Sequence, residues 1–167
     1  VSVVVRRDGY SKLLGDNRWG FFPGVSAGWV FGKEKFMEPL QDIFSFAKLR
    51  ASYGLNGNVS GISAYGLQGS YGLKNYGGST GLLLTGLANP GLRWEKSHTF
   101  EVGMDLGFLN NKYMANLTYY NRRTKDKYAD SPLPSHSGIS SWKTNNGELQ
   151  NQGLEVDLTA RFIDTKD

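Results

Sequence analysis

The chain of 167 residues contains no cysteine and only two histidines, His98 and His136. Without cysteine it has neither a disulfide framework nor thiolate ligands for a metal ion. Neither histidine has a second histidine at ligand spacing, so the sequence gives no support for a transition-metal site. We therefore predict no metal and no cofactor, and we interpret His98 as a structural polar residue of the lumen or the rim.

Long apolar runs are also missing. No stretch of about 18 consecutive apolar residues is present, which excludes a transmembrane helix. The mean hydropathy of -0.42 agrees with this. If the chain enters a bilayer, β-strands are the structure that remains available to span it.

Signals for nucleic-acid binding and for catalysis are absent as well. The 19 Lys and Arg residues exceed the 15 Asp and Glu residues by only four, and they are spread along the chain, so we predict no nucleic-acid partner. Ser135, His136 and Asp126 lack the strand-to-helix elbow that would present a nucleophile. The glycines at residues 66–72 do not lie between a strand and a helix, which argues against a phosphate-binding loop. We predict that the chain is not an enzyme.

What the sequence does contain is a strict alternation of apolar and polar residues in long segments. The segment at residues 100–108 carries five apolar side chains at its even positions: Phe100, Val102, Met104, Leu106 and Phe108. The same period recurs at residues 154–162. A period of two indicates strands with one apolar and one polar face, and roughly 9–11 residues is the length that a tilted strand needs to cross a bilayer.

We predict about six strands, at residues 1–7, 25–32, 46–53, 94–108, 113–123 and 147–162. The connections at residues 33–45 and 109–112 are short, and Pro39 limits the first to a helical turn or two. The connections at residues 54–92 and 124–146 are long and polar, and we expect surface loops there, the first with short strand extensions. Short and long connections alternate along the chain, as the two ends of an outer-membrane barrel require.

The faces and ends of these strands predict an all-β fold, a partial antiparallel transmembrane β-barrel. The strand at residues 46–53 places Lys48 and Arg50 on one face, which indicates a wet lumen. Aromatic residues lie near both ends of the strands, as expected for the two aromatic girdles of a barrel. The expected girdle residues are Phe108 and Tyr113 at one end, and Trp19, Phe21, Phe22, Trp94, Tyr119 and Tyr120 at the other.

We expect the chain to be a fragment of a larger barrel. Val1 is not an initiator methionine, and the alternation continues to Phe162. About six strands also do not close a barrel by themselves. The main alternative is a soluble β-sandwich, such as a carbohydrate-binding module, in which the apolar rows would pack against each other. A barrel used for surface attachment or assembly is a third interpretation.

Two groups of residues are candidates for binding. The aromatic residues of the long loops, surrounded by serine and asparagine, suit stacking on sugar rings or clamping of a peptide. These candidate ligand-binding residues are Tyr65, Tyr71, Tyr76 and Trp142. The second group is basic and lies where lipopolysaccharide phosphates would be found: Arg122, Arg123, Lys125 and Lys127. Loops that pack on themselves, and ordinary solvated charges, are the competing interpretations.

Several sequence blocks resemble the barrel of the SusC/RagA-type TonB-linked outer-membrane transporters (TonB-dependent receptors) of Bacteroidota. The order of the blocks along the chain matches that of the family. They are Arg-Asp-Gly-Tyr-Ser at 7–11, Asn-Arg-Trp-Gly-Phe-Phe-Pro-Gly-Val-Ser-Ala-Gly-Trp at 17–29, Lys-Leu-Arg-Ala-Ser-Tyr-Gly at 48–54, Asn-Gly-Asn at 56–58, Asn-Pro-Gly-Leu-Arg-Trp-Glu at 89–95, Tyr-Tyr-Asn at 119–121, Thr-Lys-Asp at 124–126 and Asn-Gln-Gly-Leu-Glu at 151–155. Two departures from the family pattern are Tyr10, where serine is usual, and Leu13-Leu14, where phenylalanine is common.

The resemblance implies a barrel of about 22 strands with an N-terminal plug domain. It further implies import of oligosaccharides or peptides with energy from the TonB complex, and a SusD-like lipoprotein partner that caps the pore. The implied location is the cell outer membrane, in contact with lipid and lipopolysaccharide. We expect residues 1–167 to be part of the barrel domain, with the plug domain, the TonB-contacting segment and the remaining strands outside this sequence.

Overall fold

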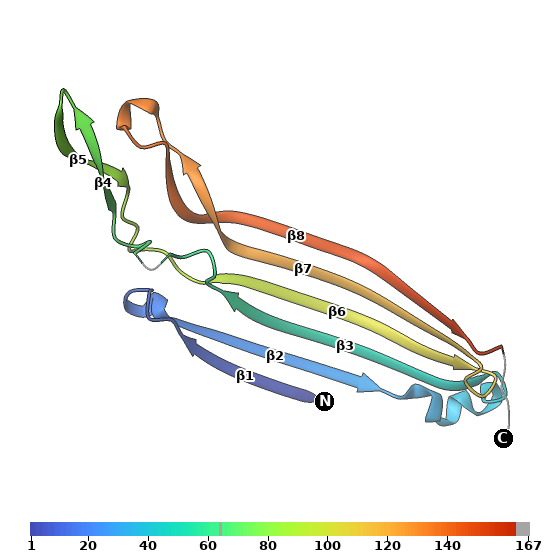
Figure 1. The fold of residues 1–167 in the computed structure, drawn as a ribbon. Helices are drawn as coiled ribbons and strands as arrows, with labels where there is room; N and C mark the ends of the chain where they lie inside the picture. Colours follow the sequence, from blue (N-terminus) through green and yellow to red (C-terminus); the bar gives the residue numbers. More distant parts are fainter. Residues whose placement is uncertain (64, 163–167) are drawn as a thin grey trace, which may run out of the picture.

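Residues 1–63 and 65–162 are described by the computed structural model, and their main feature is a six-stranded antiparallel sheet (Figure 1). The strands lie side by side in the order β1-β2-β3-β6-β7-β8. Their bounds are Ser2–Gly9 for β1, Trp19–Trp29 for β2, Phe44–Asn58 for β3, Glu95–Phe108 for β6, Tyr113–Pro132 for β7 and Ser141–Ala160 for β8. Each strand pairs antiparallel with its neighbours, which confirms the predicted partial-barrel topology.

A separate two-stranded hairpin forms within the long connection between β3 and β6. Its strands are β4, Ser70–Tyr76, and β5, Ser79–Gly86. Gly77 and Gly78 join them with φ angles of 56° and 85°, the left-handed conformation that a tight two-residue hairpin turn requires. The predicted strand extensions in this loop are therefore present, and they project beyond the end of the six-stranded sheet (Figure 1).

The helical content consists of short 3-10 turns in the described part of the chain. They are η1, Gly15–Arg18; η2, Phe31–Lys33; η3, Lys35–Leu40; and η4, Ser135–Ser137. The pair η2 and η3 confirms the predicted short helical connection, with Pro39 inside η3. None of the described helices has the length and apolar character needed to cross a membrane. The tight turn after β6 also forms as predicted, with positive φ at Leu109, Asn110 and Asn111.

Several predicted strand ends were wrong because pairing continues into polar sequence. β7 and β8 extend through most of residues 124–146, which had been predicted as a loop, and leave only residues 133–140 between them. The extended pairing is interrupted by register shifts between Thr124 and Lys127, where Asp126 has a φ of 56°. Polar strands without an apolar face give no alternation signal, although their backbones pair equally well.

The start of β2 was also predicted too late, at residue 25. The structure begins this strand at Trp19 and includes Pro23 within it. Pro23 lies opposite Val5 of β1, whereas the pairing of β2 with β3 begins only at Gly24. A proline has no amide hydrogen to donate, and it is tolerated here because its strand is paired on one side only at this level.

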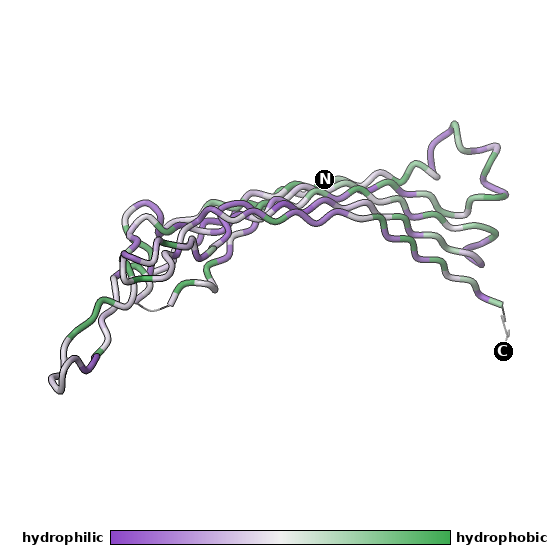
Figure 2. Tube along the Cα trace, turned by 90° about the horizontal axis from the view of Figure 1, so that it is seen from above, coloured by the Kyte–Doolittle hydropathy of each residue, from purple (hydrophilic) through white to green (hydrophobic). Residues whose placement is uncertain are grey.

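The register separates the sheet into an apolar face and a polar face. One row across four strands consists of Leu49, Met104, Leu117 and Val156, and the next row consists of Lys48, Asp105, Asn116 and Asp157. Figure 2 shows the resulting change between hydrophobic and hydrophilic residues along the strands. The six-stranded sheet is a single layer, and Leu154 and Leu158 on its apolar face are 69% and 77% exposed. A β-sandwich would cover these rows with a second sheet, and the described residues provide none there.

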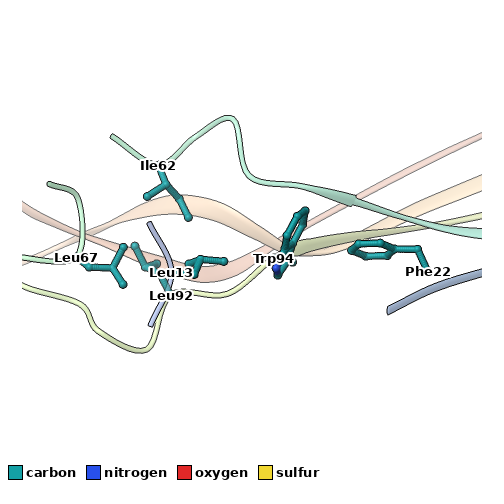
Figure 3. Packing of buried hydrophobic residues seen from close by; sticks show 6 residues of the cluster. All are labelled: Leu13, Phe22, Ile62, Leu67, Leu92 and Trp94. Atoms are coloured by element: carbon teal, nitrogen blue, oxygen red, sulfur yellow. The ribbon is translucent and has the colours of Figure 1, made fainter. Parts of the chain in front are cut away.

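The largest group of buried apolar residues lies at the end of the sheet that carries the long connections, whereas Met37 of η3 and Ala47 of β3 are buried at the opposite end. Leu13, Phe22, Ile62, Leu67, Leu92 and Trp94 form this cluster (Figure 3). Two of them, Phe22 and Trp94, had been predicted as girdle residues. That prediction was wrong, because they are only 3% and 7% exposed. Tyr120 is not a girdle residue either, since it lies on the polar face against Gly153.

Candidate functional site

The apolar face carries exposed aromatic side chains near both ends of the strands. Phe21, Tyr53, Phe100 and Tyr119 lie toward the end with the long connections, and Trp29 and Tyr113 lie toward the other. The half-buried Phe108 lies opposite Tyr113 at that second end. Phe100 and Phe108 are separated by eight residue steps, or about 27 Å along β6. After strand tilt this spacing is close to the apolar band of roughly 25 Å in outer-membrane barrels. The apolar face therefore has the dimensions of a lipid-facing wall.

The polar face is organised around the guanidinium group of Arg50. Its Nε donates to Asp105 Oδ1 at 3.2 Å, and its Nη2 donates to Thr118 Oγ1 at 2.5 Å. The group lies across Gly103, where an added Cβ would be 2.5 Å from Arg50 Cζ. The side chain thus bridges three neighbouring strands, because β6 has a glycine at this position of its polar face.

Beside Arg50 the polar face is hollowed into a depression of about 600 Å³. Its lining includes side chains of both charges and neutral hydrogen-bonding groups: Arg50, Glu101, Thr118, Tyr120, Arg122, Asn151, Gln152, Glu155 and Asp157. Such a surface holds water and polar solutes, and it is unsuited to contact with lipid. The apolar face therefore suits contact with lipid, and the polar face suits contact with water.

At the end with the long connections, an aromatic contact joins the sheet to the loop cluster. We call this region the rim assembly and define it as Phe22, Asn58, Arg93, Trp94, Glu95, Asp126, Tyr128 and Asn145. Trp94 packs edge-on against Phe22 with ring centroids 5.2 Å apart, and its Nε1 donates to the carbonyl of Arg18 at 3.2 Å. Gly20 and Gly57 leave room for the Phe22 ring, since an added Cβ would lie 2.3 and 2.1 Å from Phe22 Cζ.

The rim assembly also contains a buried carboxylate. Glu95 is 4% exposed, and both of its oxygens accept hydrogen bonds of 2.7 Å, one from Asn58 Nδ2 and one from the amide of Tyr128. A buried carboxylate is tolerated when it is hydrogen-bonded in this way. Glu95 thereby ties β6 to β3 on one side and to the extension of β7 on the other.

A second polar contact holds the segment before β6. Arg93 Nη2 donates to Asp126 Oδ1 at 2.7 Å, and Asn145 Nδ2 donates to the carbonyls of both Arg93 and Asp126. The hydrogen bond from Arg93 holds the pKa of Asp126 below its usual value. Burial raises the pKa of Tyr128, and the nearby Glu95 carboxylate adds to that shift. Together these bonds fix the long connection against the extended β7–β8 hairpin.

The four predicted ligand-binding aromatic residues are not brought together in the structure. Tyr71 and Tyr76 lie on β4, five residues apart, so alternation places them on opposite faces of the β4–β5 hairpin. Tyr65, Tyr71 and Tyr76 are highly exposed, at 77%, 69% and 89%. Trp142 is half-buried on β8 and donates to the carbonyl of Ala88 at 3.3 Å. Their roles in binding stay predictions.

The predicted basic group is divided between the two faces. Arg122 lines the depression on the polar face, whereas Arg123 and Lys125 lie on the same face as Tyr119. Arg123 forms an ion pair with Glu148. Lys127 follows the register shift at Asp126. His98, interpreted above as structural, makes a 2.8 Å hydrogen bond with the Tyr53 hydroxyl through Nδ1.

Sequence reasoning did not single out the residues of the rim assembly as a unit. The sequence nevertheless contained a signal for most of these residues, because they belong to the blocks that carry the family resemblance. These residues are Phe22, Asn58, Arg93, Trp94 and Glu95. What could not be seen was that these separated blocks meet in space. Among residues 1–63 and 65–162, no three His, Asp or Glu side chains are grouped so as to hold a metal ion.

Comparisons with known proteins agree with this geometry. The family described as "TonB dependent receptor-like, beta-barrel" matches residues 2–164. TonB-dependent receptor P3 of Formosa agariphila is 36% identical over 98% of this chain, and TonB-dependent receptor SusC of Bacteroides thetaiotaomicron is 32% identical over 98%. The chain spans 17% of the length of each of these relatives.

Solved structures give the same result. The structure described as that of the RagAB peptide transporter superposes with a TM-score of 0.83 at 32% identity, covering 99% of this chain and 18% of the other. The siderophore receptor PirA from Pseudomonas aeruginosa, at 17% identity and a TM-score of 0.56, shares the fold. The match across residues 2–164 and these similarities confirm the resemblance: the chain belongs to the TonB-dependent receptor β-barrel family of outer-membrane proteins and is of the SusC/RagA type.

Proposed function

We propose that this chain is a wall segment of an outer-membrane active transporter that imports oligosaccharides or peptides with energy from the TonB complex. The observation that carries the proposal is the division of one single-layered sheet into two faces. One face is apolar, exposed and bordered by aromatic residues, and the other is charged and hollowed. A wall between lipid and a water-filled lumen requires this division.

The polar face supports recognition of polar solutes by the lumen. Arg50, Arg122, Glu101 and Glu155 place both signs of charge around the depression, together with the hydroxyl of Tyr120. Charged groups of both signs suit the termini and side chains of peptides, whereas the hydroxyl and amide groups also suit oligosaccharides. The similar SusC and RagAB proteins favour a transporter, and RagAB is described as a peptide transporter.

The partners follow from the same proposal. The plug domain and the segment that contacts TonB belong to parts of the receptor outside this sequence. A SusD-like lipoprotein would cover the end that carries the β4–β5 hairpin and the extended β7–β8 hairpin. The rim assembly holds this end together through Glu95 and Arg93, and so offers a firm base for a cap. The proposal requires no covalent chemistry from any side chain.

The test uses the whole receptor in its native diderm host. The outer membrane is isolated and extracted with carbonate, and uptake of fluorescently labelled oligosaccharide and peptide pools is measured with and without an intact TonB complex. We expect the receptor to stay in the membrane and one of the two pools to enter only when TonB is intact. A soluble receptor would favour the β-sandwich binding module, and a membrane-integral receptor without TonB-dependent uptake would favour an attachment or assembly barrel.

A further inference from the structure

A basic patch lies on the apolar face, just beyond the aromatic residues at the rim. Lys96 of β6 lies directly opposite Lys125 of β7, and both side chains are exposed. In the next row of this face, His98 lies opposite Arg123. We call Lys96, Arg123 and Lys125 the outer basic patch.

The pairing of the two lysines is unfavourable in isolation. Side chains directly opposite each other on antiparallel strands have Cβ atoms roughly 4.5–5.5 Å apart, and like charges at such positions are destabilising. Arg123 is paired with Glu148, and the nearby Asp126 is paired with Arg93. Among the described residues, neither Lys96 nor Lys125 forms an ion pair, so the patch retains an excess of positive charge.

The height of the patch on the wall indicates what it faces. Phe100 belongs to the exposed aromatic row, and Lys96 lies four residues farther along β6, about 13 Å along the strand. Aromatic girdles mark the boundary between hydrocarbon and headgroups. On a membrane-embedded receptor, the lysine ammonium groups therefore lie at the level of the outer-leaflet headgroups.

We propose that the outer basic patch binds the phosphate groups of lipid A, the membrane anchor of lipopolysaccharide. The proposal rests on the outer-membrane location that forms part of the proposed function. A phosphate between Lys96 and Lys125 would receive charge-assisted hydrogen bonds from both, and it would remove their mutual repulsion. The acyl chains of the same molecule would lie against the apolar rows that begin at Phe100 and Tyr119.

The structure changes the set of residues expected from the sequence. Arg122 faces the depression on the opposite side of the sheet and cannot contribute to a lipid site. Lys96 was not part of the expected basic group, because it lies on a different strand from the other residues. Strand pairing alone places it beside Lys125.

The experiment compares two double variants of the whole receptor, purified from outer membranes in detergent. Lys96→Gln/Lys125→Gln removes the patch, and Lys33→Gln/Lys35→Gln removes the same charge at the opposite end of the sheet. Binding is measured with purified phosphorylated lipid A, with the same lipid A after phosphatase treatment, and with inorganic phosphate. We expect the patch variant to bind phosphorylated lipid A about ten-fold more weakly, the control to match wild type, and wild type to bind dephosphorylated lipid A about ten-fold more weakly.

Three results would overturn the proposal. They are equal binding by the patch variant and wild type, equal binding of both lipid A forms by wild type, and displacement of lipid A by millimolar inorganic phosphate, which would indicate a free-phosphate site. If the patch variant does not fold, as judged by heat-modifiable gel mobility, Lys96→Arg/Lys125→Arg must retain binding. Uptake assays on the same proteins separate the two proposals. If the wild-type receptor binds phosphorylated lipid A through the patch but shows no TonB-dependent import, only the proposed function is contradicted.

Discussion

Trp94 packs edge-on against Phe22, with ring centroids 5.2 Å apart, and joins the start of β6 to the start of β2. The two residues belong to different sequence blocks, Arg-Trp-Glu at 93–95 and Trp-Gly-Phe-Phe-Pro at 19–23. The two rings lie next to each other at the end of the six-stranded sheet that carries the long connections (Figure 3). The contact shows that sequence blocks which identify the family also hold the long connections against the end of the sheet.

Replacing Gly57 with alanine should destabilise the rim assembly. The added Cβ would lie 2.1 Å from Phe22 Cζ and 2.7 Å from Trp94 Cε3, so the two rings would have to move. We expect a loss of about 1–3 kcal/mol in the free energy of unfolding, measured by thermal unfolding of the whole receptor. Gly54→Ala is the matched control on the same strand, since nothing lies within 4 Å of its added Cβ. Equal stability of the two variants would contradict the close packing of Phe22 and Trp94 against Gly57.

Replacing Glu95 with glutamine should weaken the tie between β6 and its neighbours. An amide retains one acceptor oxygen, so either Asn58 Nδ2 or the Tyr128 amide loses its buried partner. A loss of about 1–3 kcal/mol is expected. Hydrogen exchange of the Tyr128 amide in the whole receptor would detect the change, with Glu101→Gln on the polar face as the comparison. Unchanged exchange at Tyr128 would show that the bond contributes nothing.

Acid should loosen the contact between Arg93 and Asp126. The pKa of Asp126 is lower in the folded protein than its ordinary value of 3.8, so the stabilisation is complete above the unfolded-state pKa and is lost as the pH falls through the folded-state pKa. The contribution should be below about 1 kcal/mol because the Arg93 side chain is 48% exposed. Protease cleavage of the rim should rise below about pH 4 in wild type.

Asp126→Asn provides the control for the acid effect. Asparagine accepts the left-handed backbone conformation, φ 56°, that residue 126 adopts, so the fold is preserved while the titrating group is removed. Between pH 6 and pH 3, the cleavage rate of the variant should rise less than that of wild type, because residue 126 no longer titrates. A pH dependence identical to that of wild type would assign the effect to another carboxylate.

Arginine should be tolerated on one face of β7 and rejected on the other. Leu117 lies near the middle of the apolar face, where arginine costs about 2–4 kcal/mol in a membrane barrel. Asn116 is its neighbour on the polar face and lies opposite Asp105 and Asp157. Leu117→Arg should therefore reduce the amount of heat-modifiable receptor in the outer membrane, whereas Asn116→Arg should not. Equal effects would mean that the apolar face does not contact lipid.

Tyr71 and Tyr76 should differ in their effect on ligand binding, because they lie on opposite faces of the β4–β5 hairpin. Tyr71 shares its face with Leu73, Leu82 and Leu84, which together form an apolar surface for stacking. Tyr71→Ala in the whole receptor should weaken ligand affinity about five- to ten-fold by loss of the aromatic contact, and Tyr76→Ala should weaken it less. Unchanged affinity in both variants would exclude the hairpin from binding.

The membrane-spanning part of the fold could be predicted well from the sequence, and the parts outside it could not. Alternation at residues 100–108 identified β6 and both of its faces, because an apolar face leaves a period of two in the sequence. The extension of β7 beyond Arg123 was missed, since strands surrounded by water have no such period. Arg50 was predicted to lie on the lumen face and does lie on the polar face, but its contacts with Asp105 and Thr118 depend on strand register.

By itself, the sequence determined the fold class, the number and order of the spanning strands and the family, because each is encoded in local patterns and contiguous blocks. The tertiary structure alone decided which distant residues meet. It buried Phe22 and Trp94 where a girdle had been predicted, closed Asn58 and Tyr128 around Glu95, and set Lys96 beside Lys125. The physical reason is that antiparallel pairing joins residues far apart in the chain, and a single sequence carries no direct record of that register.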